Sequence, residues 1–322
     1  MNIQRHLLDY KTEKNLNELG DMVVFIENMM EECMNQIDGN VPNEVVIPML
    51  IHRHLLQKAD SIHANIDVGT EDASKAIMRT LIENYIYLAY ILHSKTDEKS
   101  KAYYLGWYKS LKAELLKFKS DHKKSPIINS FLGGELDHLF PGESVQVEID
   151  WVDKKIKAPW LKEINKKWNK VQRRTNRSFI NWHALFGHPK IRHVAVSVGM
   201  EAEYETLYSI YSQETHSTNA MRLLEHRDGI SYFKPLRAYE DPDTIISMAS
   251  TYLWRATDLT LKKLFPEKQS AFHLYSINKQ GRLHDEEEKE ALQRLLFLLN
   301  KYKCLLLKYE EHNVIGICFD IF

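Results

Sequence analysis

The stretch that most constrains the fold is a helix-forming segment at residues 74–93, SKAIMRTLIENYIYLAYILH. Apolar side chains recur at helical spacing on one face and continue onto the opposite face, which is typical of a helix buried nearly all round. Arg79 and Glu83 stand four residues apart in this segment and therefore share a face. Because buried charges are costly unless they are paired or used, we expect a polar site inside the protein at this helix.

The composition is typical of a globular protein, since 44% of the 322 residues are hydrophobic and 27% are charged. The formal net charge of −1 provides no overall attraction to nucleic acid or anionic lipid, so any such attraction must be local. The three cysteines (Cys33, Cys304 and Cys318) form no CxxC pair and predict neither a disulfide framework nor a zinc site. No apolar run reaches the roughly 18 residues that a membrane span requires, and the polar start lacks the apolar core of a signal peptide. We therefore expect a cytoplasmic protein without membrane contact.

Hydrophobic periodicity along the chain predicts helices far more often than strands. We expect helices at residues 15–37, 44–66, 74–93, 99–119, 202–216, 242–265 and 285–312. The segment SVQVEIDW alternates apolar and polar residues and predicts a short strand, and the final NVIGICFDIF predicts a strand or a docked extended end. These elements predict an all-α fold, an antiparallel helical bundle around the buried central helix. We expect the bundle domain at residues 1–240 and a helical C-terminal extension at residues 241–322.

The first candidate site combines the central helix with the helix at 202–216. Ser212 and His216 are four residues apart and share a face of that helix. If the two helices pack together, Arg79, Glu83, Ser212 and His216 form one polar cluster. A histidine can act as a general acid or base, and an arginine can hold a phosphate. The alternative is a structural network in which Arg79 pairs with Glu83 and His216 caps a helix end.

Two segments carry a resemblance to a known family, NIDVGTEDASKAIMRTLIENYIYLAYIL and NWHALFGHPKIRHVAVSVGMEAEYETLYSIYSQETHS. Together they resemble the bacterial domain-of-unknown-function family 5677, over about residues 45–220. That family has an Arg-x-x-x-Glu helix and a Trp-started segment that leads through a Gly to Tyr-x-x-Tyr-Ser-x-x-x-His. The matching residues are Arg79, Glu83, Trp182, Gly199, Tyr208, Tyr211, Ser212 and His216. The resemblance implies an all-helical fold and a site, and it implies no particular activity.

The chain also has a remote likeness to the HEPN superfamily of small helical bundles. Many of its members are metal-independent ribonucleases of toxin–antitoxin and antiviral systems, in which an Arg-x(4–6)-His motif acts in a dimeric cleft. This chain departs from that motif, because Ser212 stands near the place of the arginine before His216. Arg79 is our candidate for supplying the guanidinium from the neighbouring helix. Arg177 and His183 fit the spacing literally, but such a match is expected by chance in a chain with 15 histidines.

A second candidate is the strongly basic segment at 151–177, which interleaves cations with Trp151, Trp160 and Trp168. Positive charge beside aromatic rings suits single-stranded nucleic acid, through phosphate contacts and base stacking. The alternative is a solvated helix whose tryptophans pack into the core, because Trp160 and Trp168 are eight residues apart. The predicted nucleic-acid-binding residues are Lys154, Lys155, Lys166, Lys167, Lys170, Arg173, Arg174 and Arg177.

Other chemistries find little support in the sequence. His183, His188 and His193 are spaced by five and share no helix face, and no HExxH or Cys/His pattern accompanies them, so we expect no metal site. A hydrolase built on Ser212 and His216 lacks a GxSxG elbow. Walker and GxGxxG fingerprints are also absent, so we expect no cofactor.

These patterns lead to two functional hypotheses. The first is an HEPN-like, metal-independent endoribonuclease that serves as a bacterial toxin or antiphage defence effector. In it His216 is the acid/base, Arg79 the phosphate ligand, and Glu83 and Ser212 orient them. The alternative is a non-catalytic helical sensor or interaction protein of a defence complex. The expected partners are RNA, a protein from the same operon and a second copy of the chain.

Overall fold

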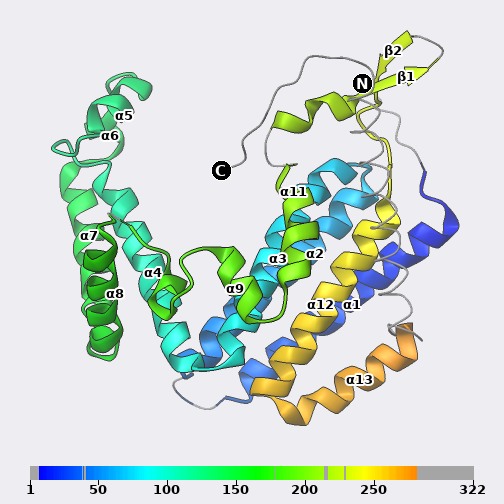
Figure 1. Ribbon diagram of the computed structural model, residues 1–322, viewed down its shortest axis with the longest axis horizontal. Helices are drawn as coiled ribbons and strands as arrows, with labels where there is room; N and C mark the ends of the chain where they lie inside the picture. Colours follow the sequence, from blue (N-terminus) through cyan, green and yellow to red (C-terminus); the bar gives the residue numbers. More distant parts are fainter. Residues whose placement is uncertain are drawn as a thin grey trace. The chain divides into compact units, whose positions relative to one another are not determined.

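The computed structural model describes residues 7–37, 39, 41–177, 179–213, 217–227 and 230–280, and helices make up most of them (Figure 1). The predicted all-α class is therefore confirmed. A two-stranded antiparallel hairpin is the only sheet of the described residues, and it pairs Leu224 with Phe233 and Arg227 with Ile230. Within that part of the chain, no helix combines the length and the hydropathy needed to cross a membrane.

The elements follow one another along the chain in a simple order. The α-helices are α1 (Tyr10–Asn35), α2 (Asn43–Asp67), α3 (Glu71–His93), α4 (Thr96–Leu116), α5 (Ser125–Phe131), α6 (Leu136–Leu139), α7 (Gly142–Ile156), α8 (Lys162–Thr175), α9 (Ile191–Ser197), α10 (Glu201–Glu203), α11 (Ser209–Gln213), α12 (Pro242–Leu264) and α13 (Pro266–Gln280). The shorter elements are the 3₁₀ helices η1 (Pro159–Leu161), η2 (Trp182–Phe186) and η4 (Ser217–Leu223), the π-helical turn η3 (Tyr204–Tyr208), and the strands β1 (Leu224–Arg227) and β2 (Ile230–Phe233).

The predicted helices agree closely with α1, α2, α3, α4 and α12. Helix α3 is buried nearly all round, as its sequence predicts, and Met78, Ile82 and Ile86 are fully enclosed. Pro266 begins α13 directly after α12. The expected helix at 285–312 and the expected C-terminal strand lie outside the described residues.

The strand predicted for SVQVEIDW is wrong, because these residues belong to α7. Val145 and Ile149 are buried together with Val152, at the spacing of a helix face. A strand would have placed Val147 on the same face as Val145, yet Val147 is 66% exposed. The alternation was therefore a coincidence within a helical pattern. The buried face of α7 packs against α4 (Figure 1). Lys112 of α4 reaches Asp153 of α7 at 2.6 Å.

The chain divides into two compact units. As far as it is described, the first unit comprises residues 7–29, 56–81 and 213–280, and the second comprises 30–55 and 82–212. The division falls within α1, α2 and α3. The expected boundary between a bundle and an extension at residue 240 stays a prediction.

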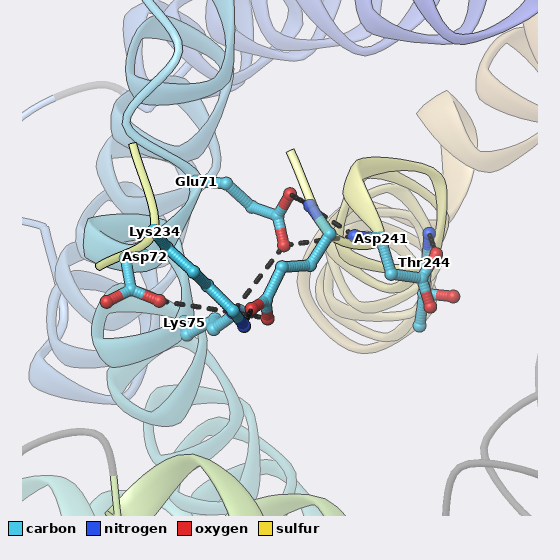
Figure 2. A network of polar contacts seen from close by, with 7 residues as sticks. Glu71, Asp72, Lys75, Lys234, Asp241 and Thr244 are labelled. Atoms are coloured by element: carbon cyan, nitrogen blue, oxygen red, sulfur yellow. Dashed lines mark hydrogen bonds and ion pairs between the residues drawn. The ribbon is translucent and has the colours of Figure 1, made fainter. Parts of the chain in front are cut away.

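In the first unit, a partly buried ionic network joins the start of α3 to the segment before α12 (Figure 2). The Glu71 carboxylate, which is 1% exposed, accepts hydrogen bonds from the backbone N–H groups of Glu240 and Asp241. Lys75 pairs with Glu240 at 2.7 Å and with Glu71 at 3.6 Å. Asp241 then caps α12 by accepting from the Thr244 N–H at 3.3 Å. These contacts hold the chain between β2 and α12 against α3.

The candidate nucleic-acid interface and the sites beside it

Helix α3 places Glu83 among tyrosine hydroxyl groups of the second unit. The Tyr208 hydroxyl donates a hydrogen bond to the Glu83 carboxylate at 3.4 Å. Burial, followed by the charge and hydrogen bond of Glu83, raises the pKa of Tyr87 well above its usual range. Burial and the same carboxylate raise the pKa of Tyr103. Glu83 therefore lies among phenols, and its charge disfavours ionisation of Tyr87 and Tyr103.

Ser212 lies one helical turn after Tyr208 and bonds to its backbone. Its Oγ donates to the Tyr208 carbonyl oxygen at 2.7 Å. Tyr208 ends the π-helical turn η3, and such turns are frequent at functional sites. Tyr208 therefore contacts Glu83 through its hydroxyl and Ser212 through its backbone carbonyl. The polar cluster of Arg79, Glu83, Ser212 and His216 stays a prediction.

The structure gives less information on Arg79 and His216, the other two members of the predicted cluster. Arg79 is half-buried on α3, one helical turn before Glu83. His216 lies outside the described residues, so its predicted role as acid/base stays a prediction.

An aromatic layer packs beside the Glu83 cluster, around Trp182 of η2. The Trp182 ring contacts the rings of Tyr87, Tyr90 and Tyr103, with centroids 5.4–5.8 Å apart. Gly106 of α4 allows this approach, because a Cβ added there would lie 3.1 Å from the Trp182 Cβ. The layer fixes η2 on α3 and α4.

The three tryptophans of the basic segment have different environments. Trp168 of α8 is 1% exposed and packs inward, as the structural interpretation predicted. Trp151 and Trp160 remain 43% and 38% exposed. Lys155 lies 5.5 Å from the centroid of the Trp151 ring. The predicted interface therefore has one exposed indole ring on α7, a second on η1, and one buried indole on α8.

The cations of this segment differ in whether a carboxylate pairs with them. Lys166 pairs with Glu163 at 2.8 Å, and Lys167 reaches Glu98 at 3.5 Å. A second group has exposed side chains that find no carboxylate partner among the described residues: Lys170, Arg173, Arg174 and Arg177. Lys154 is also exposed, at the end of α7. Positive charge left unpaired at a surface is available to an anionic partner.

Two hollows adjoin these unpaired cations. The larger, of about 650 Å³, is lined by Asn169, Gln172, Arg173, Asn176 and Arg177. The other, of about 370 Å³, is lined by Lys166, Asn169, Lys170 and Arg173. The two hollows share Asn169 and Arg173. Their linings combine cationic groups with amide groups, which can donate and accept hydrogen bonds.

The histidines of the loop after α8 form no metal site. His183 is 1% exposed, and its Nδ1 contacts the carbonyl oxygen of His188. Burial lowers the pKa of His183, so the ring is neutral at pH 7. No group of three metal-ligating side chains occurs among the residues that the structure describes. Since α8 ends at Thr175, Arg177 and His183 do not share a helix, and their spacing does not make an HEPN-type motif.

A further pocket of the second unit was missed by the sequence patterns. It has a volume of about 460 Å³, and its lining includes Tyr90, Lys99, Phe186 and His188. Burial, assisted by the charge of Lys95, lowers the pKa of Lys99 to about 8. No sequence signal distinguishes Lys99 from other lysines near the start of a helix, because its burial depends on η2 and α8. Tyr87 could have been found, since it follows Glu83 by four residues in one helix.

The fold and these sites define an all-helical protein with a cationic helix surface and a half-buried carboxylate among tyrosines. A family model matches residues 45–230, and its description is "Family of unknown function (DUF5677)". The chain belongs to this family, which confirms the resemblance in the sequence. The searches of curated proteins and of solved structures found no match.

Proposed function

We propose that this chain binds single-stranded RNA along α8 and cleaves it without a metal ion, as an HEPN-like endoribonuclease. In this proposal it acts in the cytoplasm as a bacterial toxin or antiphage defence effector. The observation that carries the proposal is the group of four exposed cations on α8 and just beyond it, which lack carboxylate partners in the described residues.

The spacing of these cations supports contact with a phosphate backbone. Lys170, Arg173 and Arg174 lie within about one turn of α8, and Arg177 follows its end. Guanidinium groups bind phosphates with two parallel hydrogen bonds, which favours arginine at such contacts. Asn169 and Asn176 add amides that can pair with base edges in the adjoining hollows.

The catalytic part of the proposal rests on the sequence pattern. His216 would take the proton of a ribose 2′-hydroxyl, whose oxygen then attacks the adjacent phosphorus. The bond to the 5′ oxygen breaks, so that a 2′,3′-cyclic phosphate and a 5′-hydroxyl end are formed, and a proton returns to the 5′ oxygen. Arg79 would hold the phosphate, while Glu83 and Ser212 orient the site. A second copy of the chain and a protein from the same operon are the proposed protein partners.

One observation favours the alternative, a non-catalytic helical sensor or interaction protein of a defence complex. Ser212 donates to the Tyr208 backbone, and the Tyr208 hydroxyl donates to Glu83. Glu83 and Ser212 therefore already have partners within the protein. A satisfied polar network of this kind stabilises a helical bundle without any reaction.

The binding proposal is tested with a fluorescently labelled single-stranded RNA. The variant Arg173→Ala/Arg174→Ala/Arg177→Ala is compared with the control Lys123→Ala/Lys262→Ala/Lys263→Ala, which removes the same charge from exposed lysines elsewhere. We expect the first to weaken binding at least tenfold and the control to change it less than threefold. Equal effects of the two variants would reject α8 as the interface.

The catalytic proposal is tested by expressing wild type, Arg79→Ala and His216→Ala in a bacterial host. Growth and total RNA integrity are scored, and purified protein is assayed for RNA cleavage with EDTA present. We expect only the wild type to arrest growth and to cleave RNA, while both variants keep the melting temperature of the wild type. RNA binding without cleavage would support the sensor, and so would a His216→Ala variant that loses several kcal/mol of stability.

A further inference from the structure

The pocket beside Lys99 has a lining of one charge sign. It is formed by the end of α3, the start of α4, and parts of α8, η2 and α9, all in the second unit. Its lining residues are Tyr90, His93, Ser94, Lys95, Lys99, Lys167, Leu185, Phe186, His188 and Ser197. Three of these are lysines, two are histidines and none is acidic. Such a lining attracts anions and repels cations.

Lys99 is the unusual member of this set, because its ammonium group is buried without a counter-charge. The residue is 4% exposed. Its Nζ donates to the Tyr90 carbonyl oxygen and lies 3.8 Å from the centroid of the Tyr90 ring. No carboxylate of the described residues pairs with it. Buried ammonium groups are rarely left without an anion, since desolvation costs several kcal/mol. An anion supplied from outside would provide the missing partner.

The start of α4 adds a second attraction for an anion. Lys95 precedes this 21-residue helix in a left-handed conformation (φ 53°), and no side chain caps the first-turn N–H groups. Of the two carboxylates in that turn, Asp97 pairs with Lys101 at 2.6 Å, and Glu98 pairs with Lys167 of the pocket lining at 3.5 Å. Exposed N–H groups and a helix dipole favour negative charge at such an end.

The remaining walls of the pocket are aromatic. The rings of Tyr90 and Phe186 line it, and the Lys167 ammonium lies 4.2 Å from the centroid of the Phe186 ring. A volume of about 460 Å³ is larger than a phosphate ion needs and falls in the range of pockets for small organic ligands. A flat ring attached to the anion would use this aromatic surface.

We propose that this pocket binds a nucleoside monophosphate, with the phosphate between Lys99, Lys95 and the start of α4 and the base against Phe186 and Tyr90. The same chemistry is present in a free mononucleotide and in the 5′-phosphorylated end of an RNA. The proposal does not depend on RNA binding by α8, because a mononucleotide is too small to need that surface.

The test is calorimetric titration of the full chain with AMP, adenosine and inorganic phosphate. We expect AMP to bind and both fragments to bind at least tenfold more weakly, since each lacks half of the contacts. Lys99→Met should weaken AMP binding at least tenfold. The matched control is Lys109→Met, which removes another partly buried lysine of α4 from outside the pocket and should change binding less than threefold. His188→Ala gives a second variant of the pocket if Lys99→Met does not fold.

Absence of AMP binding at millimolar concentration would overturn the proposal, as would equal binding to Lys99→Met and Lys109→Met. Inorganic phosphate that binds as tightly as AMP would reject the nucleoside part. Competition of AMP with a tetranucleotide, with and without a 5′-phosphate, distinguishes a free mononucleotide from the 5′-phosphorylated end of an RNA as the ligand. If the phosphorylated form displaces AMP, the site serves an RNA end; if neither does, it serves a free nucleotide.

Discussion

The Lys75 ammonium lies 2.7 Å from the Glu240 carboxylate, although 165 residues separate the two in sequence. Glu71 completes the contact from the first turn of α3, where its carboxylate receives two backbone N–H groups (Figure 2). Burial alone would lower the pKa of Lys75, but Glu240, Glu71 and Asp72 together raise it above its ordinary value. This ion pair therefore holds Lys75 charged while it fixes the segment before α12.

Replacing Lys75 with methionine should destabilise the first unit strongly. The substitution keeps most of the side-chain volume, but it leaves the buried Glu71 carboxylate without its cation. Removal of one member of a buried ion pair costs about 3–5 kcal/mol. The measurement is urea unfolding followed by circular dichroism. The control is Lys14→Met, because the Lys14–Glu18 pair is exposed and should contribute less than about 1 kcal/mol. Equal losses in the two variants would contradict the network's role.

Glu240 should make stability depend on acid pH. Burial opposes its ionisation, but Lys234 and Lys75 lower the pKa of Glu240 from 4.5 to about 2. The folded state thus binds the proton less readily than the unfolded chain, so this contribution is complete above pH 4.5 and is lost as the pH falls towards 2. We expect Glu240→Gln to be less stable than the wild type at pH 7, by about 1–2 kcal/mol after solvent screening. The difference should shrink between pH 4.5 and 2; a constant difference would contradict this assignment.

Trp182 should be the main packing residue of the second unit's aromatic layer. It is 9% exposed and contacts three tyrosine rings. Trp182→Ala should lower the free energy of unfolding by about 3–5 kcal/mol, because it leaves a cavity between α3 and α4. Trp151→Ala is the control, since that indole is 43% exposed and should cost about 1 kcal/mol. Chemical denaturation of both variants gives the comparison.

The sequence predicted much of the fold because helical periodicity is a local property. The bounds of α3 and α12 follow from it almost directly. It failed at α7, where Val145, Val147 and Ile149 fit a strand pattern as well as a helical one. Only packing against α4, which leaves Val147 exposed, decides between the two.

The sites were predictable to a smaller extent, because they depend on contacts between distant segments. Glu83 and Ser212 were singled out by spacing within their own helices, but the contact of Glu83 with the Tyr208 hydroxyl was not predicted. The partner of Lys75 could not be found in this way, since no local pattern connects α3 with Glu240. Lys99 was missed for the same reason: its burial is a property of the folded unit.

RNA binding along α8 should depend steeply on salt. Each phosphate contact on a single strand adds about −0.7 to the slope of log K against log salt concentration. If Arg173, Arg174 and Arg177 each neutralise one phosphate, the triple alanine variant should have a slope reduced in magnitude by about 2. Titrations with the same RNA at several potassium chloride concentrations give the two slopes. Parallel slopes would show that these side chains contact no phosphate.

Lys99 should make stability rise with pH in the alkaline range. Its pKa is about 8 in the folded protein, against an ordinary 10.5, because burial and Lys95 disfavour the charge. The other titratable side chains of the lining are Tyr90, Lys95, Lys167, His93 and His188, and none is a carboxylate. Glu98 pairs with Lys167 at 3.5 Å. Between pH 8 and 10.5 the unfolded chain therefore binds the proton that the folded chain has released, and stability increases with pH.

Relative to Lys99→Met, the wild type should gain about 2 kcal/mol over this range, since each pKa unit corresponds to about 1.4 kcal/mol and water screens part of the effect. Unfolding of both proteins at intervals across the range measures the gain. Parallel profiles would show that Lys99 titrates normally and that the pocket does not hold a buried, uncompensated charge.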